Sequence, residues 1–374
     1  MQKLTRRNIL AGTCAGIWAL AATSRGAWGE ASSQGTGIRF LDMTGEEITL
    51  PRPARRIVDL WTIGTAFAIA AHGSPSRIVG VNTIAHAQFK SGLLGRLYPE
   101  VLDIPYDLSI GNGAPNIERL AKLDPDLVID FRQGGHDSAA AMRNAGLRVA
   151  RYSEIEGGIR ATIAALLTMY GQMIGDTTRA QRIIAQMHER LTRLDVLKTV
   201  PQPDRQSVLL AMPSGDNLFV SGGDAGGLFS DFIYQAGGIN AAATLPGFSI
   251  ASVEQIASWD PDAILVFQSE GADLAQIYDH PILGGGKAVA GRRVYMLPIG
   301  ANNWGSMGPD EFLSPIWLAE LLYPHLLDSA LREDMRQAYA TIFDRDMTDQ
   351  QMDEVLRIDL NSRSANYERF LKRA

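Results

Sequence analysis

The residue types that usually carry enzyme chemistry are sparse in this chain. Its six histidines stand apart and form no HxH, HxxxH or HExxH group, which disfavours direct capture of a zinc or manganese ion. The only cysteine, Cys14, lies in an N-terminal apolar run, and Thr13 before it is not the small residue that a lipoprotein signal requires. No Gly-x-Ser-x-Gly motif is present, and segment 222–227 lacks the ending of a phosphate-binding loop. We expect no cofactor and no enzyme activity, with an exported enzyme of unusual type as the alternative.

Length and composition predict a globular protein of about two domains. The 374 residues are 46% hydrophobic and 20% charged, which is enough apolar surface for a sizeable core. The formal net charge is −6, and no Lys or Arg run follows the N-terminus. Nucleic acid is therefore not an expected partner, because phosphate binding requires a basic face. We expect a monomer.

The N-terminus predicts export to the periplasm. Arg6 and Arg7 precede a modest apolar run at 9–22, which is too short to span a bilayer comfortably. Adjacent arginines followed by Ile-Leu are typical of a twin-arginine signal, and the small residues at 27–29 offer a cleavage site. A general secretory signal or a retained anchor is the alternative. We expect a signal peptide at 1–29 and no lipid anchor.

One sequence unit occurs twice and organises the rest of the chain. Residues 116–130 match residues 252–266 without gaps, and each copy has a Glu near its start and an Asp-Pro-Asp six residues later. The pattern predicts a short amphipathic helix that breaks at the Asp-Pro-Asp and runs into a buried parallel strand. The copies are separated by roughly a domain length, which is too long for a solenoid repeat. Two α/β lobes of related topology, each with a mostly parallel sheet, are therefore predicted.

Other short apolar segments extend this frame. Strands are expected at 56–60, 77–81, 147–151, 207–212 and 293–297. Helical periodicity at 158–174 and again at 177–194 predicts a helical connection between the lobes, which permits only small rocking of one lobe on the other. The expected domains are an N-terminal lobe at 37–156, a connecting helix at 157–176, and a C-terminal lobe with C-terminal helices at 177–374.

The order and spacing of several motifs resemble the periplasmic binding proteins with a helical backbone that serve importers of ferric siderophores, haem and cobalamin. The matching segments are 42–45, 50–51, 53–58, 78–81, 116–118, 123–128, 237–240, 252–254, 260–262 and 291–295. Each is weak alone, but together they cover nearly all of the chain after the signal. The resemblance implies two α/β sandwich lobes joined by a long rigid helix with a ligand cleft between them. It also implies the substrate-binding component of an ABC importer.

The resemblance gives a role to the glutamate of each repeat copy. In the family these glutamates sit at the outer tip of each lobe and pair with arginines of the importer's transmembrane subunits, which implies that Glu118 and Glu254 are docking residues. Two separated carboxylates on matched lobes would steer and align a large partner. The alternative is that both are ordinary first-turn glutamates at the positive end of a helix.

The loops after the predicted strands should line the cleft, because ligands of open α/β sheets bind outside the carboxyl ends of the strands. The residues expected there combine rings, amides, hydroxyls and a few cations, which suits an aromatic or oxygen-rich chelate. They are Trp61, Thr62, Asn82, His86, Tyr106, Asn112, Arg132, His136, Met212, Ser214, Asn217, Gln268, Asn303 and Trp304. Arg132 is the expected grip on a carboxylate, catecholate or oxyanion, with a surface arginine as the alternative. Trp304 has the alternative of closing the core of its lobe.

The expected ligand is a metal chelate such as a ferric siderophore. Haem stays open, because one axial ligand from a cleft loop would suffice, and His86, Tyr106, His136 and Met307 are of suitable types. Cobalamin stays open as well. So do molybdate and tungstate, because backbone amides and hydroxyls can hold an oxyanion with little trace in the sequence.

Overall fold

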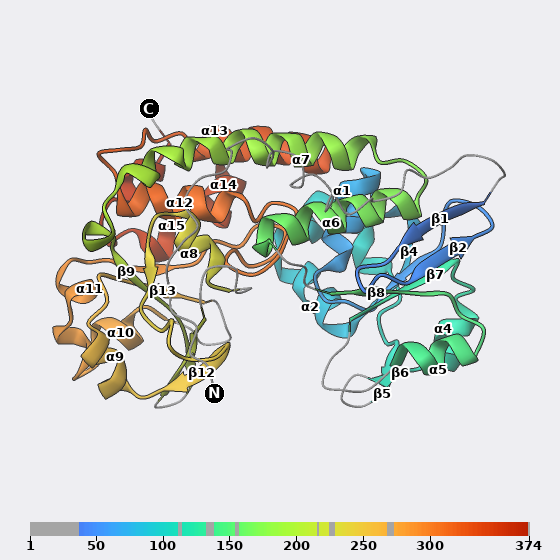
Figure 1. Cartoon of the computed structure of the whole chain (residues 1–374), viewed down its shortest axis with the longest axis horizontal. Helices are drawn as coiled ribbons and strands as arrows, with labels where there is room; N and C mark the ends of the chain where they lie inside the picture. Colours follow the sequence, from blue (N-terminus) through green and yellow to red (C-terminus); the bar gives the residue numbers. More distant parts are fainter. Residues whose placement is uncertain are drawn as a thin grey trace, which may run out of the picture. The chain divides into compact units, whose positions relative to one another are not determined.

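A computed structural model describes residues 37–110, 114–131, 138–153, 157–214, 217–223, 229–267 and 273–372 (Figure 1). Two separate sheets form the frame, one in each half of this part of the chain. We call the sheet of the first half, with the helices that pack on it, the first lobe, and its counterpart the second lobe. Within the described residues, no helix is both long and apolar enough to cross a membrane.

The sheet of the first lobe is entirely parallel, with strand order β4-β3-β7-β8. Its strands are β3 (Ile57–Asp59), β4 (Ile78–Val81), β7 (Leu127–Phe131) and β8 (Val149–Tyr152). Side chains alternate between two buried faces, as the continuous apolar runs predict: Leu127 and Ile129 join one core cluster, whereas Val128 joins another. Four helices pack on this sheet: α1 (Gly64–His72), α4 (Ile117–Lys122), α5 (Ser138–Asn144) and α6 (Gly158–Met173).

The sheet of the second lobe is mixed. Strands β9, β11, β13 and β14 are parallel. Strand β10 pairs antiparallel with β9, and β12 pairs antiparallel with β10; the sequence patterns indicated neither of these two strands. The strands are β9 (Ser207–Ser214), β10 (Asn217–Ser221), β11 (Ile239–Asn240), β12 (Phe248–Ala251), β13 (Ala263–Val266) and β14 (Val294–Met296). The helices that cover it are α8 (Asp231–Gln235), α9 (Val253–Trp259), α10 (Ala275–Tyr278), α11 (Lys287–Ala290) and α12 (Leu313–Leu322).

The connection between the lobes is helical but not one continuous helix. Helix α6 ends at Met173, Gly175 takes a left-handed φ of 75°, and α7 (Thr178–Leu191) then begins and continues into the 3₁₀ segment η3 (Thr192–Thr199). Helix α7 packs beside α13 (Leu331–Phe343), as Figure 1 shows, and also touches α1 of the first lobe. The turn at Gly175 lets two helices pack on different neighbours where one straight helix could not.

The remaining elements flank these layers. They are β1 (Ile38–Leu41), β2 (Glu47–Leu50), β5 (Ser109–Ile110), β6 (Ala114–Pro115), α2 (Thr83–Ser91), α3 (Leu93–Leu97), α14 (Asp349–Val355), α15 (Ile358–Asn361), η1 (Pro75–Arg77), η2 (Pro99–Asp103), η4 (Gln202–Asp204), η5 (Leu283–Gly285) and η6 (Tyr367–Phe370). Strands β1 and β2 form an antiparallel hairpin, as do β5 and β6.

The two repeat copies fold as predicted, each as helix, turn and strand: α4 with β7, and α9 with β13. The first aspartate of each Asp-Pro-Asp has a left-handed φ of 43° and ends its helix, at Asp124 and at Asp260. The second aspartate accepts the backbone N–H of the neighbouring strand: Asp126 Oδ2 lies 3.1 Å from the N of Arg56, and Asp262 Oδ2 lies 2.8 Å from the N of Ser207. Each aspartate therefore fastens the start of its own strand to the strand beside it.

Candidate functional site

In the first lobe, the parallel strands β3 and β4 bring the predicted residues Trp61, Thr62 and Asn82 to one edge of the sheet, because parallel strands end on the same side. In the first lobe, Asn82 links two of these strand ends. Its Oδ1 accepts the N–H of Ala85 at 2.7 Å and so caps α2. Its Nδ2 donates to the carbonyl of Leu60 and to the hydroxyl of Thr62, both at 2.9 Å. Asn82 thereby holds the loop after β3 against the loop after β4.

Trp61 is part of the core rather than an open wall of the cleft. Its side chain is only 5% exposed, and its ring stacks on Tyr152 with centroids 4.2 Å apart. Phe67 and Phe131 complete the cluster at 6.0 Å each. Aromatic pairs of this kind contribute about 0.5–1.5 kcal/mol beyond their buried area. The cluster makes the loop that carries Thr62 rigid.

A buried carboxyl lies under the same loop. Asp59 Oδ1 accepts the N–H of Trp61 at 3.1 Å, and its Oδ2 accepts the hydroxyl of Tyr170 at 2.7 Å. A Cβ at Gly64 would lie 2.4 Å from both oxygens, so only glycine allows α1 to approach this close. Burial raises the pKa of Asp59 to about 7, although both donors favour the charged form.

His86 and Tyr106 form a stacked pair, with ring centroids 3.7 Å apart. His86 is buried and its Nε2 lies 3.0 Å from the carbonyl of Leu102, so this nitrogen is engaged within the protein. Tyr106 is 39% exposed, with the ammonium of Lys90 5.9 Å above its ring. Of His86 and Tyr106, both predicted as ligand residues, only Tyr106 has substantial solvent-exposed surface.

In the second lobe, a buried carboxyl again shapes the loop that carries predicted residues. Asp310 Oδ2 accepts from the indole of Trp304 at 3.2 Å, from the N–H of Ala301 at 3.0 Å and from the hydroxyl of Tyr339 at 2.6 Å. Burial raises the pKa of this carboxyl. Trp304 is 1% exposed, so its ring belongs to the core, whereas Asn303 next to it is partly exposed.

The antiparallel strands of the second lobe present an apolar surface that the sequence patterns did not indicate. Phe219 of β10 pairs with Met212 of β9 on one side and with Ile250 of β12 on the other, which puts the three side chains in one row. Ile250 is 61% exposed, and Phe248 of the same strand stacks edge-on against Phe229 at 4.9 Å. Asn217, at the start of β10, is exposed. Met212 therefore belongs to a partly exposed apolar row.

A cavity of about 850 Å³ lies where elements of both lobes meet. Its lining residues come from α2 and α3 of the first lobe, and from the loop after β14 with α14 and α15 of the second. They are Gln88, Gly92, Leu93, Arg96, Ile299, Gly300, Ala301, Asn302, Asn303, Gln350, Asp353, Glu354, Arg357, Ile358 and Asp359. Of the predicted ligand residues, Asn303 is in this set. We call this space the inter-lobe cavity.

One ion pair crosses the inter-lobe cavity. Arg96 of α3 lies 2.9 Å from Glu354 of α14, and both side chains are more than a third exposed. Such a pair contributes about 0–1 kcal/mol to stability. The sequence analysis did not predict Arg96, Glu354 or the other lining residues of α3 and α14. Helix α14 reaches the first lobe only through tertiary packing, and neither helix has a sequence pattern that indicates a ligand site.

Several predicted residues lie outside what can be described. Asn112, Arg132, His136 and Gln268 fall outside the described residues, as do Arg6 and Arg7, and the side chain of Ser214 is likewise not described. Among the described residues, no three His, Cys, Asp or Glu side chains converge as metal ligands would.

The two predicted docking glutamates occupy equivalent positions. Glu118 and Glu254 both lie in the first turn of their helices, two residues after the N-capping residues Asn116 and Ser252. Glu118 pairs with Lys122 at 2.7 Å on an exposed surface. The Glu254 carboxylate, which is fully exposed, accepts from its own backbone N–H and from Ser252, and these bonds lower its pKa. Helices α4 and α9 lie on the sides of their sheets away from α7 and α13 (Figure 1).

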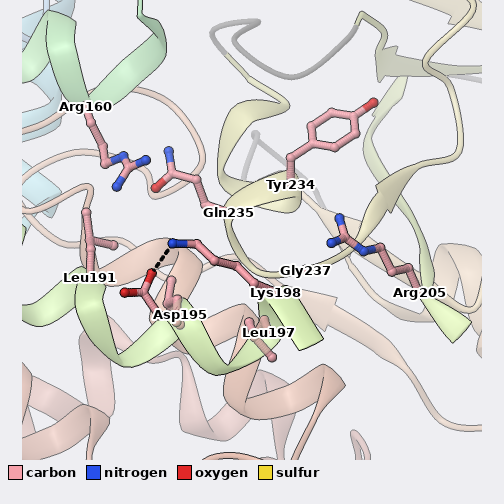
Figure 2. Close-up of a pocket in the computed structure, with 10 residues that line it drawn as sticks. Arg160, Leu191, Asp195, Leu197, Lys198, Arg205, Tyr234, Gln235 and Gly237 are labelled. Atoms are coloured by element: carbon pink, nitrogen blue, oxygen red, sulfur yellow. Dashed lines mark ion pairs between the residues drawn. The ribbon is translucent and has the colours of Figure 1, made fainter. Parts of the chain in front are cut away.

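A smaller cavity of about 190 Å³ lies at the junction of α6, η3 and α8. Figure 2 shows three cations around it, Arg160, Lys198 and Arg205, together with Gln235. The ammonium of Lys198 pairs with Asp195 at 2.7 Å, and both side chains are well exposed. The charges of Lys198 and Asp195 at this cavity are therefore largely open to solvent and screened by salt.

The buried Asp59 should make stability depend on pH. An unfolded aspartate has a pKa of about 3.9, so between roughly pH 4 and pH 7 the folded protein holds a proton that the unfolded chain has lost. The stabilisation present at low pH is therefore lost as the pH rises through about 7. We expect Asp59→Asn, which cannot ionise, to lose less stability than the wild type between about pH 5 and pH 8, as measured by urea unfolding. Asp204→Asn, at an exposed site, serves as the control, and equal losses in Asp59→Asn and wild type would contradict the assignment.

Comparison with known proteins agrees with this architecture. A family model described as periplasmic binding protein matches residues 97–299, more than half of the chain. The molybdate-binding protein MolA of Haemophilus influenzae is 26% identical over 331 residues, which cover 82% of this chain and 92% of MolA. The structure of MolA bound to molybdate matches with a TM-score of 0.70 at 21% identity, covering 83% of this chain and 99% of that one.

Two further solved structures share the fold. A periplasmic solute binding protein from Veillonella parvula has a TM-score of 0.76 at 24% identity and covers 87% of this chain and 98% of its own. CeuE of Helicobacter pylori, solved with Ni-His, has a TM-score of 0.67 at 21% identity and covers 86% and 99%. These structures support the two-lobe α/β fold, and the family model goes further: the chain belongs to the periplasmic binding protein family of ABC importers, whose members bind solutes and are not enzymes.

Proposed function

We propose that the protein captures a metal chelate, most specifically a ferric siderophore, and delivers it to the membrane subunits of an ABC importer. The observation that carries this proposal is the inter-lobe cavity of about 850 Å³, which is in the range of sites for drug-sized ligands. Its lining combines amide side chains such as Asn302, Asn303 and Gln350 with apolar residues such as Leu93 and Ile299. Amides orient an oxygen-rich ligand and apolar groups supply contact area.

The apolar row of the second lobe supports the same class of ligand. Met212, Phe219 and Ile250 lie on the face opposite Leu218 and Ala251, which pack into the core cluster beneath α9 and α11. The row therefore lies on the face of the sheet that α9 and α11 do not cover, and Ile250 in it is exposed. An organic chelate has carbon surface that can pack on such a row, whereas a bare oxyanion has none.

A second candidate ligand is molybdate. It is favoured by the similarity to MolA, which extends over 82% of this chain at 26% identity. An oxyanion needs only backbone amides, hydroxyls or a guanidinium, and it would occupy a small part of the inter-lobe cavity. The two candidates differ in size and in carbon content, so direct binding measurements separate them.

A ligand panel tests the proposal. We expect the mature protein to bind a ferric catecholate or ferric hydroxamate complex, with quenching of tryptophan fluorescence and a rise of the melting temperature of a few degrees when the complex is in large excess over its dissociation constant. Haem, cobalamin and molybdate are measured in parallel, and the metal-free siderophores and sulfate serve as controls. Binding of molybdate alone would replace the chelate with the second candidate, and no binding across the panel would contradict both.

We propose that Glu118 and Glu254 dock the importer. The support is their equivalent placement: each lies in the first turn of the helix of one repeat copy, each is exposed, and α4 and α9 are on the sides of their sheets away from α7 (Figure 1). Exposed carboxylates of this kind change the rate of association and the alignment of a partner more than they change affinity for a small ligand.

Charge reversal tests the docking residues. We expect Glu118→Lys with Glu254→Lys to reduce transport by the reconstituted importer by at least about tenfold, because two rim charges would then repel their partners. Ligand affinity should stay within about twofold. The control carries the same charge change elsewhere, as Glu189→Lys with Glu368→Lys at two exposed positions. Equal loss of transport in test and control variants would exclude a docking role, and a loss of ligand affinity would assign the glutamates to the ligand site.

We propose that a twin-arginine signal exports the protein and is removed near residue 29, in keeping with the periplasmic location of the family. Arg6→Lys with Arg7→Lys should leave most of the protein in the cytoplasm as precursor, because the export machinery reads the arginine pair. Fractionation and intact-mass measurement check this. Normal export of the doubly substituted protein would indicate a general secretory signal instead.

A further inference from the structure

Two cations line the inter-lobe cavity, and within the described residues one of them is paired and the other is not. Arg96 pairs with Glu354 at 2.9 Å, and Asp353 pairs with Arg332 of α13. Arg357 lines the same cavity, yet within the described residues its guanidinium has no ion pair or hydrogen bond. Its Nε is buried and lacks a hydrogen-bond partner. The Nε atoms of Arg151, Arg190 and Arg369 also lack a partner, but the terminal nitrogens of those arginines make hydrogen bonds within the protein.

The backbone of Arg357 is also unusual. It has φ 52° and ψ 47°, in the left-handed region, and stands between the end of α14 and the start of α15. This position after a helix is normally occupied by glycine, because a side chain crowds the following carbonyl there. The left-handed turn directs the chain from α14 into α15 while the side chain of residue 357 lines the cavity.

A buried asparagine holds this turn in place. The carbonyl of Arg357 accepts from the N–H of Asn361 at 3.0 Å and from its Nδ2 at 3.2 Å. Asn361 in turn binds both backbone groups of Met296 at the end of β14, at 2.8 and 3.0 Å. The backbone of the turn is therefore anchored through Asn361 to β14, the edge strand of the second-lobe sheet, and none of these bonds uses the arginine side chain. The fold at this turn therefore does not use the guanidinium, which leaves it available to a ligand in the cavity.

We propose that Arg357 grips an anionic oxygen-bearing group of the ligand in the inter-lobe cavity. A guanidinium offers donors in a fixed planar fork that matches two oxygens of one group. The chemistry it fits is a carboxylate, a catecholate or a metal oxyanion. This inference rests on the proposed function, since it takes the inter-lobe cavity as the ligand site, and it adds the residue that recognises the charge of the ligand.

The test uses the glycine that the backbone favours. Arg357→Gly should weaken binding of the anionic probe that the wild type binds, a ferric catecholate complex or molybdate, by about 10- to 100-fold in calorimetric titration, as expected for loss of a charge-assisted bidentate contact. The melting temperature of the ligand-free protein should stay the same or rise. Arg357→Ala should lose affinity to the same extent but melt below Arg357→Gly and close to the wild type, because alanine keeps the left-handed strain that the arginine already has. Arg357→Lys should recover only part of the affinity, because an ammonium lacks the planar fork.

The chain offers a matched control in Arg292, which is also left-handed, at φ 53°, but is exposed and does not line the cavity. Arg292→Gly should leave affinity unchanged. Unchanged affinity in Arg357→Gly would overturn the inference while leaving the proposed function standing. A melting temperature of ligand-free Arg357→Gly clearly below that of the wild type would overturn it in favour of a purely structural role. If the wild type binds neither probe, the inference fails, and the proposed function fails with it unless a ferric hydroxamate complex binds.

Discussion

The alignment of the central parallel strands in both lobes depends on the hydrogen bonds that Asp126 and Asp262 make to the start of a neighbouring strand. A parallel pair has no hairpin to set its register, so some other interaction must align the two strands. Each aspartate does this at the end where its strand begins, directly after a left-handed turn that ends the preceding helix. Because each pair is parallel, its strands then run toward the same edge of the sheet, where the loops after β3 and β13 lie. A carboxylate that accepts several backbone N–H groups is also held in its charged form, and the pKa of Asp126 is lowered accordingly, against the effect of its partial burial.

The two lobes are tied together on the side opposite α4 and α9. Arg179 of α7 donates to the carbonyl of Ala70 in α1 at 3.0 Å, to that of Ile342 in α13 at 3.0 Å and to the carboxylate of Asp344 at 2.6 Å. Arg345 lies over the ring of Tyr98, 4.6 Å from its centroid, and the Tyr98 hydroxyl donates to the carbonyl of Phe343. The guanidinium of Arg179 thus links α7 to α1 and to α13 through backbone carbonyls, and so connects the two lobes. These contacts hold the first and second lobes close to one relative position before a ligand binds. Less conformational entropy is then lost on binding.

Both lobes support their strand-end loops by the same physical device. A buried carboxyl, Asp59 in the first lobe and Asp310 in the second, accepts a tyrosine hydroxyl and a backbone N–H of the loop it supports. Each lies beside a tryptophan that is almost fully buried. Removing a carboxyl from water is costly, and the hydrogen bonds that offset the cost also make the loop rigid. The tryptophans that composition alone suggested as ligand contacts instead belong to the core that supports their partly exposed neighbours Thr62 and Asn303.

The sequence by itself was sufficient for the frame. Apolar runs, the Asp-Pro-Asp units and the order of motifs determined the parallel strands, the helix-turn-strand repeat, the family and the helical connection, because these features depend on local periodicity and backbone preference. Strands β10 and β12 escaped prediction, since pairing at a sheet edge depends on partners distant in sequence. Only the tertiary structure decided that Trp61 and Trp304 are buried, that α14 meets α3 across a cavity, and that the unpaired cation there is Arg357. A cavity is the space left between elements after they pack, so no local pattern in the chain encodes it.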